Sequence, residues 1–324
     1  MTSLMVAGTE ERTARSGGLV RIGVFLAVMV AFAGWKALQP AIASATPAVT
    51  TSYYVDTESG STIQSWGCTA GQSGKSGTII LDFGRPAYSS SLSAYGTINL
   101  DGSGVFLSNG AIQTLIHDFA TGWYNCSGIS PKVKIAWGTN NCINGSGASG
   151  CNIPQPQVPS FTTAGTKWSQ FTNSFGSWLS SSGFSSQESA AGAIDAEPAW
   201  NPGWNDSHDL IAGYNSISAP YIDFDYGSLD PGYWTNTQEY YVAWNNTTSF
   251  PFPEVYNTTV ASEWESLDEW AAGQSAGSMY FEGVMCTTTG LSCSSAYSTM
   301  LSDLQSHSST TQSSIPYLTQ IKFG

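Results

Sequence analysis

The chain has 324 residues, of which 10% are charged, and its 23 acidic residues outnumber the 10 basic ones to give a net charge of −13. Nucleic acids and anionic membrane surfaces bind clustered Lys and Arg, so this balance argues against both as partners. The length is suited to one large domain, which we expect to act as a monomer.

A secretory signal peptide is predicted over residues 1–45. Three arginines precede the apolar run 23–34, and residues 43–45 read Ala-Ser-Ala, which fits the small-residue pattern of a cleavage site. The run is short for a transmembrane helix, which needs about 20 apolar residues. An uncleaved anchor is the alternative. We therefore expect a secreted, extracellular protein without a membrane segment after cleavage.

A single α/β domain is predicted over residues 76–324, after a Ser/Thr/Gly-rich lead-in at 46–75. Apolar, Gly-flanked strands alternate with amphipathic helices, which indicates a parallel sheet. At this length a closed (β/α)₈ TIM-type barrel is favoured over an open doubly wound sheet. The predicted strands are 77–84, 132–138, 190–197, 219–227, 252–257, 278–285 and 316–323; the helices are 110–124, 167–183, 208–217, 262–273 and 296–307.

The cysteines predict disulfides, because all six follow the signal peptide and an even count is typical of exported domains. Two close spacings favour Cys142–Cys151 and Cys286–Cys293, which leaves Cys68–Cys126. A zinc site is the competing interpretation, but no C-x-x-C pair or His-rich cluster accompanies the cysteines.

Acidic residues stand near the ends of several predicted strands. Asp82 ends the first, and Asp195 and Glu197 end the third, where residues i and i+2 project to the same face about 6.5 Å apart. Since barrel active sites lie at the carboxyl ends of the strands, these acids are expected to share one mouth. The other strand-end acids are Asp223, Asp225, Glu254 and Glu282.

Such a group of carboxyls suits general acid–base catalysis. Buried carboxyls raise one another's pKa, so that one can stay protonated while a neighbour is ionised. We assign catalytic roles to Asp82, Asp195, Glu197 and Glu282. The alternative for each acid is a structural role in accepting backbone N–H groups. No metal or other cofactor is predicted, although a hard cation could also bind among Asp82, Asp223 and Asp225.

Substrate-binding residues are expected on the loops that follow the strands. Arg85, the only arginine beyond the signal peptide, can pair with the acids or hold a substrate oxygen through its planar guanidinium. Aromatic rings in Gly- and Pro-containing loops are typical of clefts that hold sugar rings, and their alternative role is to fold those loops down. The predicted set is Arg85, Asn140, Trp200, Trp204, Asp223, Asp225, Tyr226 and Trp234.

Other catalytic classes lack their motifs in this sequence. There is no G-x-S-x-G nucleophile elbow, no H-E-x-x-H zinc motif and no Gly-rich nucleotide-binding loop after a strand. Serine hydrolases, zinc proteases of this type and the common nucleotide-binding folds are therefore not supported.

The chain resembles the barrel-fold glycoside hydrolases of the lysozyme and chitinase types. The resemblance lies in the D-x-E arrangement of "IDAEP", with Asp195 and Glu197, and in Asp82 of "LDFG"; the further acids of the full chitinase strand motif are absent. The resemblance implies that Glu197 is the proton donor and that Asp195 orients or stabilises Glu197. We expect a secreted glycosidase acting on a polysaccharide or cell-wall glycan. A non-catalytic barrel that binds glycan, with structural or metal-binding acids, is the alternative.

Overall fold

The computed structural model describes residues 45–99, 105–142 and 158–324, and its central element is a parallel sheet of eight strands. The strands follow one another around the sheet in the order β10-β11-β1-β2-β6-β7-β8-β9. They are β1 (Val49–Tyr54), β2 (Gly77–Asp82), β6 (Val133–Asn140), β7 (Glu188–Asp195), β8 (Asp223–Asp225), β9 (Ser249–Pro251), β10 (Gly283–Cys286) and β11 (Tyr317–Phe323).

The sheet curves into a nearly closed barrel. β1 pairs in parallel with β11 over its whole length, so the first and last strands are neighbours. On the other side, a parallel bridge between Glu254 and Met285 joins the chain just after β9 to β10. The predicted parallel barrel is therefore confirmed, and it already includes β1, which precedes residue 76.

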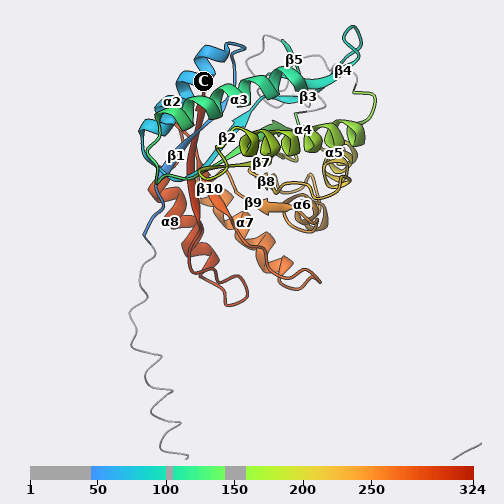
Figure 1. The fold of residues 1–324 in the computed structure, drawn as a ribbon. Helices are drawn as coiled ribbons and strands as arrows, with labels where there is room; N and C mark the ends of the chain where they lie inside the picture. The colour runs from blue at the N-terminus through green and yellow to red at the C-terminus, as the bar shows by residue number, and fades with distance from the viewer. Residues whose placement is uncertain (1–44, 100–104, 143–157) are drawn as a thin grey trace, which may run out of the picture. The chain divides into compact units, whose positions relative to one another are not determined.

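Helices lie outside the sheet and cover its outer face (Figure 1). Serine or asparagine side chains accept a hydrogen bond from the first turn of five of them, as at Ser59, Ser108 and Asn257, which fixes where these helices begin. The helices are α2 (Gly60–Gln72), α3 (Asn109–Cys126), α4 (Phe161–Ser181), α5 (Asn205–Asn215), α6 (Asn236–Ala243), α7 (Thr258–Ala271) and α8 (Cys293–Leu304).

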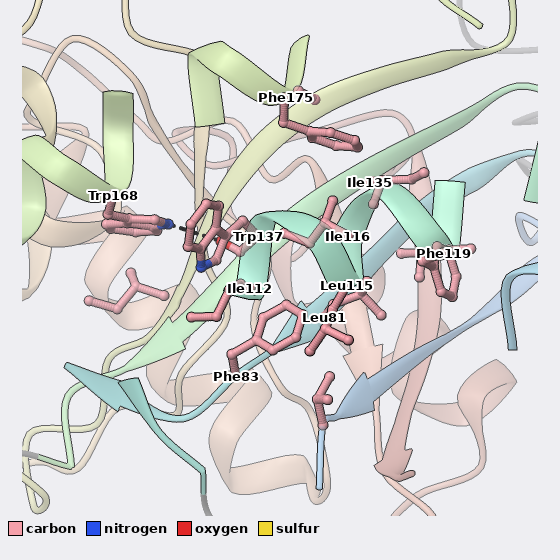
Figure 2. Packing of buried hydrophobic residues seen from close by; sticks show 14 of the residues in the cluster. Leu81, Phe83, Ile112, Leu115, Ile116, Phe119, Ile135, Trp137, Trp168 and Phe175 are labelled. Carbon is pink, nitrogen blue, oxygen red and sulfur yellow. Dashed lines mark hydrogen bonds between the residues drawn. The ribbon is translucent and has the colours of Figure 1, made fainter. Parts of the chain in front are cut away.

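The largest apolar cluster fills the layer between the barrel and helices α2 to α5. Figure 2 shows part of it, where residues of α3 pack on Leu81 and Phe83 at the end of β2 and on Trp137 of β6. Trp168 of α4 donates its indole N–H to the Trp137 carbonyl at 3.1 Å, which anchors α4 to the sheet. Alternate strand residues point the other way, into a smaller apolar cluster inside the barrel that includes Phe224.

Helices α2 and α3 pack against each other unusually closely. A Cβ atom at Gly67 would lie 2.0 Å from the Phe119 carbonyl oxygen, and one at Gly122 would lie 2.0 Å from the Gln64 carbonyl oxygen. Glycine is therefore required at this crossing. The Cys68–Cys126 disulfide links the same two helices.

Two of the three predicted disulfides are confirmed, namely Cys68–Cys126 and Cys286–Cys293. The third prediction involves Cys151, which lies outside the described residues, as does the predicted signal peptide up to residue 44. In the described part of the chain, no helix combines the length and apolar character needed to span a bilayer.

The segment after β2 holds a small antiparallel sheet that the sequence pattern did not indicate. Its strands are β3 (Arg85–Ser89), β4 (Ala94–Ile98) and β5 (Phe106–Ser108). Tyr88 and Tyr95 face each other across the β3–β4 hairpin, with ring centroids 4.9 Å apart. This hairpin stands at the carboxyl end of the barrel strands because it begins three residues after β2 ends.

Candidate active site

Four carboxyl groups meet at the carboxyl-terminal mouth of the barrel. Asp82 ends β2, Asp195 ends β7, and Glu197 and Glu254 follow β7 and β9. We refer to Asp82, Asp195, Glu197 and Glu254 as the acid cluster. Glu197 is half-buried, whereas the other three side chains are buried. The prediction that Asp82, Asp195 and Glu197 share one mouth is confirmed.

Two tyrosines from the barrel interior hold the deepest acids. Tyr54, at the end of β1, donates a hydrogen bond from its hydroxyl to Asp195 Oδ2 at 2.9 Å. Tyr226 donates likewise to Asp82 Oδ2 at 2.5 Å, and the Gly84 amide donates to Asp82 Oδ1 at 2.6 Å. Asp195 Oδ1 is buried and accepts no hydrogen bond from the described residues. Asp195 is therefore the less well solvated of the two.

Glu197 is held by groups on both of its sides. The Ser228 hydroxyl donates to Glu197 Oε1 at 2.9 Å. The side-chain amide of Asn141 pairs with the Glu197 backbone, accepting from its N–H and donating to its carbonyl, each at 3.0 Å. These bonds fix the backbone where β7 has ended and direct the carboxyl toward the mouth.

Burial raises the pKa of every member of the acid cluster, and repulsion from other members adds to this for Asp195 and Glu254. Burial, together with the charge of Asp230, raises the pKa of Glu197 to about 7 against hydrogen bonds from Ser228 that lower it. Burial, Glu197 and Asp82 raise the pKa of Glu254 to about 8. The pKa of Asp195 rises well above its usual value through burial and the three neighbouring acids.

Asp82 is the member of the acid cluster that ionises most easily. Burial raises its pKa to about 6, while hydrogen bonds from Tyr226, Gly84 and Asn140 lower it. Near pH 7 the cluster therefore combines a mostly ionised Asp82 with carboxyls that remain at least partly protonated. This is the division of protonation states that acid–base chemistry requires.

Asp223 and Asp225 do not face the mouth. Phe224 and Tyr226 belong to the interior cluster, so the alternating residues Asp223 and Asp225 point to the outer face of the sheet. There, Asp223 interacts electrostatically with Tyr214 of α5. Asp225 interacts with Glu239 of α6 in the same way. Their predicted place at a substrate site is wrong, since the strand phase sends both side chains beneath the helices.

Glu282 is also separated from the acid cluster. The predicted strand 278–285 places this acid within the strand, but β10 begins only at Gly283. Glu282 therefore stands at the amino end of the barrel, where burial lowers the pKa of Lys134 at the start of β6 and the charge of Glu282 opposes part of that shift. The Lys134 ammonium lies over the rings of Phe224 and Tyr317, at 5.0 and 5.3 Å from their centroids, and fills the floor of the barrel.

The remaining predicted residues divide between the site and the packing around it. Asn140 lies beside the acid cluster and donates its side-chain N–H to Asp82 Oδ1 at 3.4 Å. Arg85 is buried and donates to the Cys142 carbonyl at 3.4 Å. Trp204 and Trp234 pack edge to face with centroids 5.0 Å apart, and the Trp234 indole N–H donates to the Asn201 carbonyl.

Trp200 is the predicted tryptophan that follows Glu197 most closely. It is half-buried, and its backbone N–H donates to the Glu197 carbonyl at 3.0 Å. It stands three residues after the half-buried acid in the chain.

Four residues of the site were assigned no role from the sequence. Tyr54 belongs to the segment read as a lead-in, although the alternation around "SYYV" is typical of a strand. Glu254 was recognised as a strand-end acid only. Ser228 and Tyr256 lie near Glu197, and their hydroxyls hydrogen-bond, but nothing in the local pattern distinguishes them from loop residues.

Comparison with models of protein families, with curated proteins and with solved structures gives no match.

Proposed function

We propose that the protein is a secreted glycoside hydrolase in which Glu197 donates the proton to the leaving oxygen. The observation that carries this proposal is the acid cluster, where a half-buried glutamate with a pKa of about 7 stands among buried carboxyls. A general acid works best when its pKa is near the working pH. Glu197 is also the member of the cluster that a substrate reaches most easily.

Glu254 is the second catalytic carboxyl in this proposal. One oxygen each of Asp195, Glu197 and Glu254 lie within 4.8 Å of one another. Inverting glycosidases separate their two carboxyls by about 6.5–9.5 Å to seat a water, whereas retaining enzymes use about 5–5.5 Å. Oxygens this close favour the retaining arrangement, in which Glu254 attacks the sugar in its ionised form while Glu197 holds the proton that the two interacting carboxyls share. Asp195 and Asp82 are the neighbouring acids that interact with this pair through their charges.

The test combines kinetics with unfolding. Release of reducing sugar is measured across a panel of polysaccharides and peptidoglycan, and the substrate found is used with Glu197→Gln and Glu254→Gln. Each variant should lose about 10²–10⁴ in rate while its melting temperature changes little. The exposed Glu58→Gln provides the matched control for loss of a carboxylate. Full turnover by Glu197→Gln would exclude it as the donor.

A cation-binding barrel is the second candidate function, and one observation favours it. Asp195, Glu197 and Glu254 could each offer one oxygen to a common ion, and Asp195 Oδ1 accepts no hydrogen bond from the described residues. Calcium takes oxygen ligands at about 2.3–2.6 Å, which is compatible with this spacing. Calorimetric titration with Ca²⁺ distinguishes the two candidates. Tight Ca²⁺ binding that is lost in Glu254→Gln, together with no hydrolysis of any glycan in the panel, would favour the cation-binding function.

A further inference from the structure

A pocket lies outside the barrel, on the side of helices α6 and α7. It is formed between the segment 229–236, which follows β8, and the first half of α7, and its volume is about 370 Å³. Leu229, Pro231 and Trp234 supply apolar walls. Pockets for small molecules occupy about 300–1,000 Å³ and combine apolar walls with a few polar groups, so this pocket has the size for such a ligand.

A buried carboxyl faces this pocket without a partner. Glu239 of α6 lines it and is only 7% exposed, and its side chain makes no hydrogen bond with the described residues. Burial, Asp225 and Asp230 together raise the pKa of Glu239 to about 9. A buried polar group without a partner costs stability, so a ligand that bonds to Glu239 recovers part of that cost.

The charge around the pocket has one sign. Glu263 of α7 lines the pocket opposite the 229–236 segment, and burial together with repulsion from Asp230 raises its pKa. No Lys, Arg or His is among the described residues that line it. The acids facing Glu239 are therefore Asp225 from β8, Asp230 from the following segment and Glu263 from α7. A bound cation would relieve the repulsion among all four.

The lining favours an organic cation over a metal ion. Among the described residues, Glu239 and Glu263 belong to no group of three ligand atoms close enough to coordinate one ion. The Trp234 ring and the leucine and proline walls instead suit the carbon skeleton of a small molecule. An ammonium group also interacts favourably with an aromatic ring, in addition to pairing with carboxylates.

We propose that this pocket binds a primary ammonium group on a small organic molecule, with Glu239 and Glu263 as its acceptors and Trp234 beside its carbon skeleton. Amino sugars and aliphatic diamines both carry such a group. Asp230 connects the pocket to the mouth, because it accepts a hydrogen bond from the Ala199 amide at 3.1 Å and repels Glu197. A cation bound here would therefore act on the proposed catalytic Glu197 through the charge of Asp230.

The experiment is calorimetric titration at pH 6.5 with glucosamine, N-acetylglucosamine and 1,5-diaminopentane. The N-acetyl compound keeps the sugar ring and removes the cation. We expect at least one of the amines to bind at least tenfold more tightly than N-acetylglucosamine. Repeating the titration in two buffers of different ionisation enthalpy should show a proton released from Glu239 on binding. Tighter binding of glucosamine than of the diamine assigns the site to amino sugars, and the reverse assigns it to simple amines.

Variants locate the site. Glu239→Gln and Glu263→Gln should each weaken amine binding by tenfold or more with melting temperatures close to that of the parent, whereas Glu197→Gln should bind as the parent does. Equal affinity for glucosamine and N-acetylglucosamine, binding unchanged in Glu239→Gln, or no binding of either amine would overturn the proposal. Calorimetry measures binding without turnover, so these results test the ammonium site independently of whether the protein hydrolyses a glycan.

Discussion

Glu188 carries the clearest prediction about stability. It is the first residue of β7, its side chain is 2% exposed, and neither carboxyl oxygen has a hydrogen-bond partner among the described residues. Burial raises its pKa from 4.5 to about 9. In the unfolded chain this carboxyl ionises above pH 4.5, while in the folded protein it stays protonated up to pH 9.

The sign of the effect follows from which state binds the proton. Between pH 4.5 and 9 the folded state holds a proton that the unfolded state has lost, so the free energy of unfolding falls as pH rises. Each pH unit contributes about 1.4 kcal/mol, which amounts to about 3 kcal/mol at pH 7. Below pH 4.5 the Glu188 carboxyl is protonated in both the folded and the unfolded state, so it no longer lowers the free energy of unfolding in this way.

Glu188→Gln removes the ionisation and keeps the side-chain size. We expect this variant to gain up to about 3 kcal/mol at pH 7 and less than about 1 kcal/mol at pH 4.5. Urea unfolding at the two pH values measures both free energies, and Glu58→Gln serves as the exposed control. An equal change at both pH values, or a loss of stability at pH 7, would refute the assignment of a protonated, buried carboxyl.

Three further predictions rest on single contacts. Tyr226→Phe removes a hydrogen bond that lowers the pKa of Asp82, so the acidic limb of a pH–activity profile should move to higher pH. Replacing both Cys68 and Cys126 by serine opens a disulfide with a sequence separation of 58 and should cost about 4 kcal/mol in chemical denaturation. Gly67→Ala places a Cβ atom against the α3 backbone and should lower the melting temperature by well over 5 °C, or prevent folding, with calorimetry as the readout.

The barrel was predictable because its strands carry a strong apolar signal and its helices a helical period. Asp82 and Asp195 were placed correctly for the same reason, since each stands where an apolar run stops. The β1 strand was expected only as a lead-in before the barrel, because the segment 46–75 is rich in Thr, Ser and Gly. In the structure, the Ser52 hydroxyl accepts from the Ile80 amide and also hydrogen-bonds with the Thr319 hydroxyl, so a polar residue is satisfied in the sheet there.

The errors at Asp223, Asp225 and Glu282 have a common cause. A one-residue change of strand phase reverses which side chains face the interior, and a change of a few residues in the strand start moves an acid from the mouth to the floor. The sequence of a fully buried strand is apolar on both faces, so it does not define the phase. At β8, Phe224 and Tyr226 face the interior, where they pack with residues of other strands. These long-range contacts, and not the local sequence pattern, determine the phase of this strand.

The pairing of the first strand with the last one determines when the site can form. Tyr54, which holds Asp195, lies on β1 opposite Phe323 of β11, and the Gly324 amide donates to the Tyr54 carbonyl at 3.1 Å. On the ribosome, β1 emerges long before its partner, so one edge of the growing sheet stays open until β11 has been synthesised. Such distant pairings make folding slow and late. The pairing that secures Tyr54 against Asp195 therefore needs the chain up to residue 323, and we expect chains that stop before β11 to hold Asp195 less firmly.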